Sequence, residues 1–563
     1  MWTTLLKNAR VVSTFTNTIN NTNVLIKDDT IIGIGSTYKE ADKIIDLKNK
    51  FLIPGLINAH MHIESSMLKP VEFAKLSLLH GMTTCVVDPH EIVNVAGEDG
   101  LKYMLEACRN VPLCFCFMLP SCVPATKFDI SKGKLRARQM EKYFKLKDVY
   151  GLAEVMDYDA VINREKWIMD KIALANKYKK RIDGHAPCLT GERLIKYIST
   201  NIGTDHECST LDEAYEKLSL GQWILIREGT EAKNLKTLSP LLKGPTSHRC
   251  CLATDDCEVL DLMYDGQIDH VLKKAVDYGV NPFDAIRAAT YNAAKCYNIE
   301  KRGSIIVTYK ADLVAVEDLK SFKVTDVFKN GEHIVKNGKL AIELSEGKNP
   351  YKAKMLNSFK MPKLSLDSFK IKHTGIKKSR VIGVIPESLL TKHLKMDINY
   401  DINNGIDLKR DILKIAVIDA HKGTKSIALG FVNGYTMKSG AYASTVAHDS
   451  HNLIVIGTNE QDMLKAAIEV LKMRGGNIIV KDNKVIASIP FAIGGLMSDK
   501  EAIAVAKDLM NMRRKITTLG VSSKTHLFMS VSFLSLPVIP ELKITPKGLV
   551  DVVKFKLVDL IVK

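Results

Sequence analysis

The sequence has no long apolar run. A membrane-spanning helix needs roughly 20 consecutive apolar residues, and the best candidate, Leu113 to Leu119, is far shorter. The opening residues, MWTTLLKNAR, also lack the apolar core of a secretory signal peptide. We therefore expect a cytoplasmic protein that does not associate with a membrane.

Paired cysteines and arginine-rich segments are missing as well. The chain has 11 cysteines but no C-x-x-C pair, so a structural zinc knuckle is not expected and buried free thiols are. The formal net charge is +17, yet the lysines are spread along the whole chain instead of forming a basic arm. This distribution argues against nucleic-acid binding and leaves a small molecule as the expected partner, drawn to a basic surface if it is anionic.

The sequence does contain a regular alternation of strand-like and helix-like segments. With 563 residues, the chain is too long for one core, and two or three domains are expected. In the first half, eight β-rich runs alternate with helical patterns such as 70–79, 164–179 and 211–218, which predicts a (β/α)₈ barrel. The eight runs are Phe51–Ile57, Thr84–Val87, Leu113–Met118, Tyr150–Ala153, Lys180–Asp183, Ile202–Thr204, Gln222–Ile226 and Cys250–Ala253.

Both flanks of the barrel are β-rich, with a turn expected at Asn330-Gly331, and we expect them to form one small module. After a lysine-rich stretch the α/β pattern resumes. The predicted fold class is α/β: a TIM-like (β/α)₈ barrel, a small β-sandwich module and an additional α/β domain. The predicted boundaries are 1–53 plus 300–345 for the β-sandwich module, 54–299 for the barrel, 346–380 for a linker and 381–563 for the C-terminal domain.

Histidine and acidic residues follow the strand-like runs, at the end of a barrel where active sites form. His60 and His62, two apart, would face the same way on an extended strand. The full set is His60 and His62 after the first run, Glu154 after the fourth, His185 after the fifth, His206 after the sixth and Asp255 after the eighth. Four imidazoles and two carboxylates suit Zn, Fe or Mn, and one carboxylate can bridge two ions. The pattern predicts a two-metal site that activates a bridging hydroxide.

Several segments closely resemble, in the same order, the bacterial adenine deaminases of the amidohydrolase superfamily. They are PGLINAHMHIESSM, VVDPHEIVNV, GLAEVMD, DGHAP, TDHECST, IREGT and ATDD, followed by ASTVAHDSHN and GGLMSD in the C-terminal domain. The H-x-H pair marks only the superfamily, whereas HIESSM, DPHE and HDSHN together are specific to this family. The resemblance covers nearly the whole chain and implies an enzyme of purine salvage and adenine catabolism, which hydrolyses adenine to hypoxanthine and ammonia.

The resemblance also implies roles for the residues at the strand ends. Two divalent ions per subunit, Mn²⁺ or Fe²⁺ rather than Zn²⁺, would be bound by His60, His62, Glu154, His185, His206 and Asp255. In the implied reaction the bridging hydroxide attacks C6, and Asp255 moves a proton from it to the leaving amine. Glu154 bridges the ions. Glu207 either protonates ring N1 or supports the ligand beside it, with Glu91 and Glu228 as the other candidates for N1.

Other residues on the same loops are candidate substrate contacts, namely Glu64, Ser65, His90, Glu91, Arg227, Glu228 and Asp256. In the C-terminal domain a polar cluster could cover the barrel as a lid, bind another ion or stabilise a turn of its own domain; its members are His448, Asp449, His451 and Asn452. We also expect a homo-oligomer, a dimer or tetramer.

Two other functions fit part of the pattern. A hydantoinase-like or dihydroorotase-like cyclic amidase would share the barrel and the metals, but such relatives usually bridge their ions with a carbamylated lysine where this chain has Glu154. A non-catalytic nucleobase-binding protein could keep the fold. The complete set of metal-binding side chains argues against it.

Overall fold

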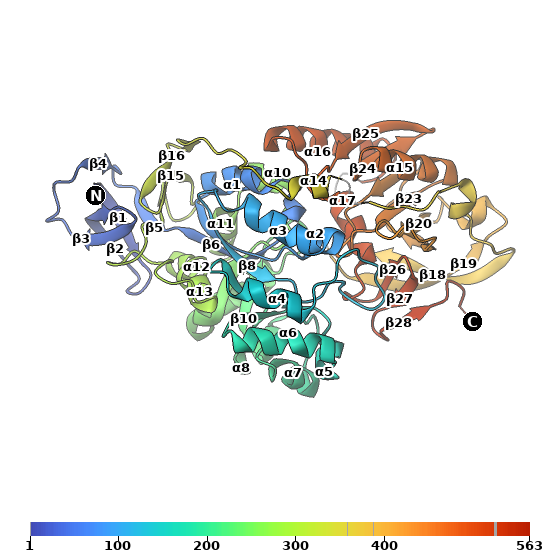
Figure 1. The fold of residues 1–563 in the computed structure, drawn as a ribbon, viewed down its shortest axis with the longest axis horizontal. Helices are drawn as coiled ribbons and strands as arrows, with labels where there is room; N and C mark the ends of the chain where they lie inside the picture. Colours follow the sequence, from blue (N-terminus) through green and yellow to red (C-terminus); the bar gives the residue numbers. More distant parts are fainter. Residues whose placement is uncertain (1, 357–358, 387, 523–525, 563) are drawn as a thin grey trace.

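The computed structural model describes residues 2–356, 359–386, 388–522 and 526–562 (Figure 1). Eight parallel strands form the predicted barrel, in the order β10-β9-β8-β7-β6 and β11-β12-β13. The two sheets meet where Met61 bridges Asp255 in parallel pairing. The strands are β6 (Leu56–Met61), β7 (Met82–Val87), β8 (Cys114–Leu119), β9 (Val149–Val155), β10 (Arg181–Gly184), β11 (Thr204–Asp205), β12 (Trp223–Arg227) and β13 (Cys250–Ala253). The α/β fold class is confirmed.

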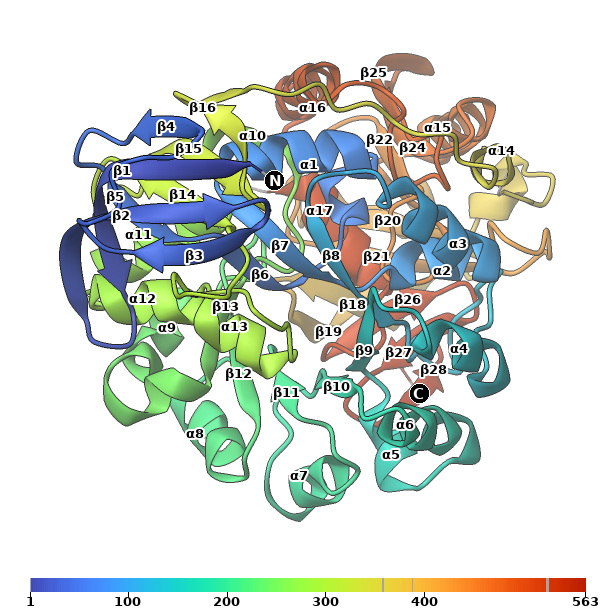
Figure 2. The ribbon, with the colours of Figure 1, turned by 60° about the vertical axis from the view of Figure 1, so that its left-hand side comes forward.

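Helices surround these strands (Figure 2), so the strands are buried on both faces, as parallel sheets require. Local signals start the helices where the sequence predicts them: Pro70 occupies the first turn of α1, and the Thr210 hydroxyl accepts from the Glu213 amide at the start of α8. The barrel helices are α1 (Pro70–Leu79), α2 (His90–Ala96), α3 (Glu98–Ala107), α4 (Ala137–Phe144), α5 (Tyr158–Ile162), α6 (Lys166–Lys177), α7 (Gly191–Ile198), α8 (Leu211–Ser219), α9 (Leu235–Leu238), α10 (Val259–Tyr264), α11 (Ile268–Asp277), α12 (Pro282–Ala288) and α13 (Tyr291–Cys296).

The predicted first strand, Phe51–Ile57, is two elements. Residues 51–54 form β5 (Phe51–Pro54), which pairs with β1 (Thr3–Ser13) and with β14 (Leu313–Val316), whereas β6 begins the barrel. The break falls at Gly55, where a Cβ atom would lie only 2.2 Å from the Thr83 hydroxyl oxygen, so only glycine allows this close approach. Strand β6 continues to Met61, which places His60 inside the strand rather than after it.

Strands from both flanks join in one nine-stranded sheet, ordered β17-β16-β15-β14-β5-β1-β2-β3 with β4 beside β1. At the predicted turn, Asn330 and Gly331 have φ angles of 49° and 80°, which suits the tight hairpin between β15 and β16. The strands are β1 (Thr3–Ser13), β2 (Thr18–Lys27), β3 (Thr30–Ile34), β4 (Lys43–Asp46), β14 (Leu313–Val316), β15 (Val324–Lys329), β16 (Glu332–Lys336) and β17 (Lys339–Leu340).

The C-terminal part contains a separate eight-stranded sheet, ordered β19-β18-β21-β20-β23-β22-β24-β25, and a three-stranded sheet, β26-β27-β28. Helices α15 and α16 pack on the larger sheet. Short helices α14 (Lys352–Met355) and η4 (Leu366–Phe369), with the start of β18, lie within the stretch expected to be a linker. The remaining elements are β18 (Ile376–Val384), β19 (Thr391–Asn399), β20 (Ile412–Ile418), β21 (Ile427–Asn433), β22 (Ala441–Ser444), β23 (Leu453–Gly457), α15 (Glu460–Lys472), β24 (Gly476–Lys481), β25 (Lys484–Pro490), α16 (Ala502–Thr517), α17 (Leu527–Ser532), η6 (Phe533–Ser535), β26 (Leu542–Thr545), β27 (Gly548–Asp551) and β28 (Lys556–Val558).

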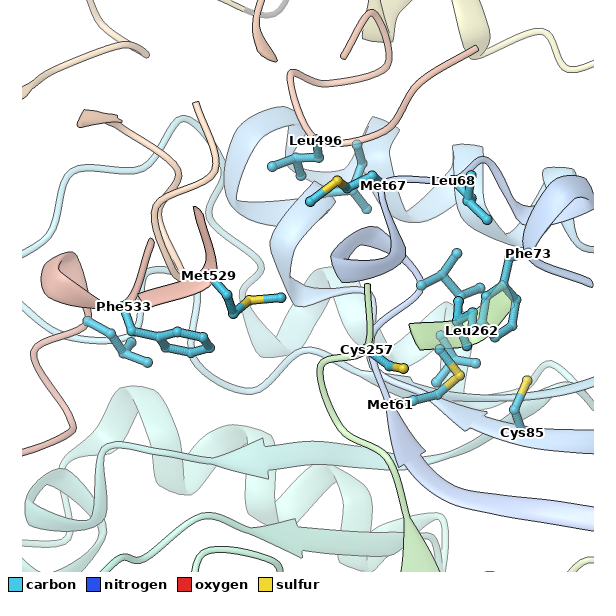
Figure 3. Packing of buried hydrophobic residues seen from close by; sticks show 14 of the residues in the cluster. Met61, Met67, Leu68, Phe73, Cys85, Cys257, Leu262, Leu496, Met529 and Phe533 are labelled. Atoms are coloured by element: carbon cyan, nitrogen blue, oxygen red, sulfur yellow. The ribbon is translucent and has the colours of Figure 1, made fainter. Parts of the chain in front are cut away.

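The C-terminal domain lies directly against the barrel. The Ser498 amide donates to the Met67 carbonyl, and the Thr545 hydroxyl donates to the Phe128 carbonyl, both at 2.8 Å. Leu496 and Met67 belong to one buried cluster, and Figure 3 shows them side by side. The two parts therefore share a core.

All 11 cysteines are free thiols, of which Cys188 is exposed. Within the described ranges, no helix combines the length and apolar character needed to cross a membrane.

Candidate active site and metal centre

The structure brings the six predicted metal-binding side chains together at one end of the barrel. His60 lies in β6 and Glu154 in β9. The others come after strands: His62 directly after β6, His185 directly after β10, His206 directly after β11, and Asp255 two residues after β13. Each of the six is at most 4% exposed. The convergence is therefore a buried cluster of four imidazoles and two carboxylates.

Glu154 is at the centre of this cluster. Its Oε1 lies 3.4 Å from Nε2 of His62 and 3.8 Å from Nε2 of His60. Its Oε2 lies 2.7 Å from Nδ1 of His185 and 3.2 Å from Nε2 of His206. Burial alone would raise the pKa of Glu154, but the surrounding imidazoles hold that pKa well below its usual range. One carboxylate thus directs one oxygen to each of two imidazole pairs.

Asp255 lies on the other side of His60 and His62. Its Oδ1 is 3.2 Å from Nε2 of His62 and 3.4 Å from Nε2 of His60, and its amide donates to the His60 carbonyl at 3.0 Å. Its φ angle of 60° is left-handed, which costs an ordinary residue about 1–3 kcal/mol. Despite burial, Arg227 and the two imidazoles hold the pKa of Asp255 well below its usual value. The fold maintains this strained backbone where the carboxylate meets the histidines.

The same contacts raise the pKa of two of the imidazoles, those of His62 and His185. Burial lowers the pKa of His62, but Asp255 and Glu154 outweigh it, and the pKa lies well above its usual value. In His185 burial is outweighed by Glu207 and Glu154, which raise the pKa to about 9. His62 and His185 therefore bind protons at neutral pH when no metal is bound, whereas burial and the neighbouring His60 lower the pKa of His206.

The residues present fit divalent metal ions. His62 Nδ1 lies 2.9 Å from the Asp88 carbonyl, and donation there leaves the Nε2 lone pair facing the two carboxylates, as in metal-binding histidines. Nε2 of His60 and of His185 and Nδ1 of His206 are buried without a hydrogen-bond partner among the described residues. Donor atoms gather within 4.8 Å of one another in overlapping groups: His60, Glu154 and His206; His60, His62 and Asp255; His185, His206 and Glu207; and His62, Asp88, His90 and Glu154. Overlapping groups of this kind suit two adjacent ions better than one.

Arg227, at the end of β12, connects the two acidic residues on this side. Its guanidinium donates to both oxygens of Glu207, at 2.6 and 3.1 Å, and to Oδ2 of Asp255 at 2.6 Å. Burial raises the pKa of Glu207, but Arg227 and the neighbouring imidazoles lower it overall. Glu207 is therefore ionised in this structure.

Of the predicted substrate contacts, only some reach the cavity. His90 and Asp256 line the cavity over the cluster. Ser65 donates to Glu91 at 2.8 Å and also bonds Asp256. Glu64 accepts from the Ile92 amide, and Glu228 pairs with Lys274 at 2.6 Å. Five of the seven lie behind the cavity rather than on its surface: Glu64, Ser65, Glu91, Arg227 and Glu228.

The polar cluster of the C-terminal domain reaches the same region. His451 Nε2 lies 3.3 Å from Oε2 of Glu91, and its Nδ1 accepts from the Ala447 amide at 3.2 Å. A neutral imidazole that accepts at Nδ1 carries its proton on Nε2, which faces Glu91 without forming a hydrogen bond among the described residues. Glu91, His448 and His451 each bring one donor atom within 4.8 Å of the others, but a proton on Nε2 of His451 would oppose ion binding there. Asp449 lies 3.5 Å from His90, and Asn452 donates to the Ile130 carbonyl at 2.8 Å.

Several residues of the site were not predicted from the sequence. Lys217, fully buried on α8, pairs with Asp205 at 3.1 Å and donates to the Ala186 carbonyl, which fixes the loops that carry His185 and His206. Apolar side chains also line the cavity. Met156 lies in the quoted segment GLAEVMD but was not singled out, and four others belong to none of the quoted segments: Leu389, Phe533, Leu536 and Ile539. Asp205 could have been found from the sequence, because it directly precedes His206 in TDHECST.

The barrel with a buried histidine and carboxylate cluster at the strand ends defines a metal-dependent hydrolase, and the amidohydrolase family model matches residues 51–334. The model of the adenine deaminase C-terminal domain matches residues 388–556. Adenine deaminases from Clostridium acetobutylicum, Halalkalibacterium halodurans and Kosmotoga olearia are 43%, 40% and 42% identical to this chain, over 98–99% of it and 95–96% of their own length. The chain belongs to the adenine deaminase family.

Proposed function

We propose that the protein hydrolyses adenine to hypoxanthine and ammonia, and that the cluster around Glu154 is the catalytic centre. Family membership supports the activity. The observation that supports the centre is the Glu154 carboxylate, with one oxygen toward His60 and His62 and the other toward His185 and His206.

These five residues and Asp255 would hold two divalent ions, Mn²⁺ or Fe²⁺. When bound, such ions supply a hydroxide at neutral pH, because metal coordination lowers the pKa of water from 15.7 to about 7. Burial of the whole cluster excludes bulk water, which strengthens every charge interaction within it. The charge on Glu154 would offset part of the charge of the ions, at the position where relatives that hydrolyse cyclic amides use a carbamylated lysine.

Asp255 moves the proton in this proposal. Its low pKa keeps it unprotonated and able to accept, and the Arg227 guanidinium holds one of its oxygens while the other faces the histidines. From this position it takes the proton of the attacking hydroxide and passes it to the leaving amine. Arg227 therefore acts as the positioning residue for Asp255.

Glu207 is the acidic side chain best placed to serve ring N1. It lines the cavity, whereas Glu91 is bonded to Ser65 and Glu228 to Lys274. Because Glu207 is ionised beside Arg227, it must first receive a proton, and the water that becomes the attacking hydroxide would supply it. The cytoplasmic location and a homo-oligomeric state remain predictions.

The test is incubation of purified, manganese-loaded protein with adenine, with hypoxanthine followed by absorbance and ammonia by a coupled assay. Formation of both products in equal amounts is expected. Turnover of a cyclic amide such as dihydroorotate, with none of adenine, would instead identify an amidase. Tight adenine binding without products would identify a nucleobase-binding protein.

A further inference from the structure

The cavity over the cluster has two chemically different sides. The barrel supplies mostly charged or polar groups, and Met156 is its one apolar residue among those that line the described cavity. The C-terminal domain supplies the polar His448 and Asp449 and, beside them, an apolar surface, which we call the roof: Leu389, Phe533, Leu536 and Ile539. Phe533, Leu536 and Ile539 are only 3–4% exposed, so the roof closes the cavity rather than facing solvent.

A flat heteroaromatic ring needs a surface of this kind. Small-molecule sites are mainly apolar and aromatic, with a few polar groups that fix orientation. The histidines and carboxylates of the barrel can hold ions and move protons, but they offer a purine little apolar contact. An aromatic ring such as Phe533 can stack on a nucleobase, an interaction that contributes substantially to nucleobase binding.

Phe533 is held rigidly in its position. The His448 ring stacks on it, with centroids 4.3 Å apart and an interplanar angle of 10°. The His448 amide in turn donates to the Ser532 carbonyl at 2.9 Å. Figure 3 shows Phe533 on the C-terminal segment, beside Met529 and across from the barrel residues Met61 and Cys257. The ring is therefore preorganised before any ligand arrives.

A single buried lysine connects the two segments of the roof. Lys543 lies in β26 and is 0% exposed, and its ammonium donates to the carbonyls of Leu389 at 2.8 Å and Phe533 at 3.1 Å. Both acceptors are backbone atoms, and within the described residues no carboxylate forms an ion pair with it. Burial lowers the pKa of Lys543 to about 7, so its nitrogen can lose a proton and still donate to both carbonyls. The two hydrogen bonds fix the distance between Leu389 and Phe533.

We propose that the roof is the purine-binding wall of the active site, and that Lys543 is the residue that positions it. The inference rests on the proposed function, since it assigns the C-terminal domain the task of recognising the ring whose amine the barrel removes. Substrate specificity then resides largely in a domain that contributes none of the predicted metal-binding side chains.

The first experiment replaces the aromatic face while keeping an apolar side chain. In Phe533→Leu we expect KM for adenine and the dissociation constant of hypoxanthine to rise about 5- to 10-fold. This factor corresponds to the lower end of the range of binding energies attributed to stacking of a base on an aromatic side chain. The turnover number should change by less than about threefold, because the lost contact stabilises the bound substrate and the transition state equally. Phe528→Leu is the matched control: Phe528 lies on the adjacent α17, is buried and packs against Tyr442 instead of lining the cavity.

The second experiment removes the connection between the two segments. Lys543→Met should raise KM and the hypoxanthine dissociation constant by a similar factor, with metal content unchanged. Lys414→Met is the control, because Lys414 is also 0% exposed in the same domain but bonds Asn404 and Glu460, away from the cavity. Equal effects in both lysine variants would mean general destabilisation and would overturn the positioning role.

Calorimetric binding of hypoxanthine separates this inference from the proposed function, because it requires no turnover. If Phe533→Leu binds hypoxanthine as tightly as the unmodified protein, the roof is not the purine-binding wall, whether or not adenine is deaminated. If the unmodified protein binds hypoxanthine and Phe533→Leu binds it weakly, the roof assignment holds even where the deaminase assay fails.

Discussion

Replacing Glu154 by glutamine tests the geometry of the centre most directly. The side chain keeps its size, but one oxygen becomes an NH₂ group that cannot bind a cation, so one of the two imidazole pairs loses its carboxylate partner. Removing one member of a buried charge pair costs about 3–5 kcal/mol, which corresponds to about 10²- to 10⁴-fold in affinity. We therefore expect Glu154→Gln to fall from two bound metal equivalents to one or fewer.

The assay is metal analysis of the dialysed protein by mass spectrometry, together with adenine turnover, which should be abolished. Glu72→Gln is a suitable control because Glu72 is equally buried, accepts from the Ala502 amide at 3.0 Å and pairs with Lys75, far from the histidines. Two tightly bound equivalents in Glu154→Gln would show that the carboxylate does not join two ions, and the two-metal reasoning would be wrong.

The remaining predictions concern protons and cations at the same site. The pKa of His185 is raised to about 9 and that of His62 lies well above its usual value, so a metal ion must displace protons when it binds. The apparent metal affinity, measured by chelator competition, should therefore rise between about pH 7 and 9. An affinity that does not change over this range would contradict the prediction. Arg227→Met should raise the pKa of Asp255, since Arg227 lowers it, and so move the acidic limb of the kcat/KM profile to higher pH; an unmoved limb would exclude Asp255 as the titrating group. Asp255→Asn should reduce kcat by roughly 10² or more, and a smaller loss with full metal content would remove its role in proton transfer. Metal-saturated protein should contain two equivalents rather than three, with the same content in His451→Gln, because His451 Nδ1 accepts from a backbone amide; a third equivalent that disappears in this variant would refute that tautomer.

The sequence predicted the barrel well because its signal is local. Strands such as β7 and β13 begin and end within about two residues of their predicted limits, since apolar runs bounded by polar turns reflect burial along a short segment. The division at Gly55 was not predictable, because pairing partners and the close approach of Thr83 are tertiary facts. Composition alone does not show that consecutive residues enter different sheets.

The metal-binding candidates were likewise visible because each lies within two residues of the end of a strand, and the topology then brings them to one place. The roof was not, because Leu389 and Phe533 are distant in sequence and look like ordinary core residues. Lys543 gave no signal either: a lysine in a strand is usually solvated, and only the folded chain shows its two carbonyl acceptors. Contacts between distant segments are what the sequence could not supply.

The position of the C-terminal domain determines how substrate and products can enter and leave the site. Hydrogen bonds from Ser498, Asn452 and Thr545 attach it to barrel loops on the side where the strands end, and the side chains beneath it are almost fully buried. A reactant therefore has no straight path along the barrel axis. The cavity beneath the domain has a volume of about 20 Å³, too small for a planar base, so domain and rim must separate before adenine can enter and before hypoxanthine and ammonia can leave.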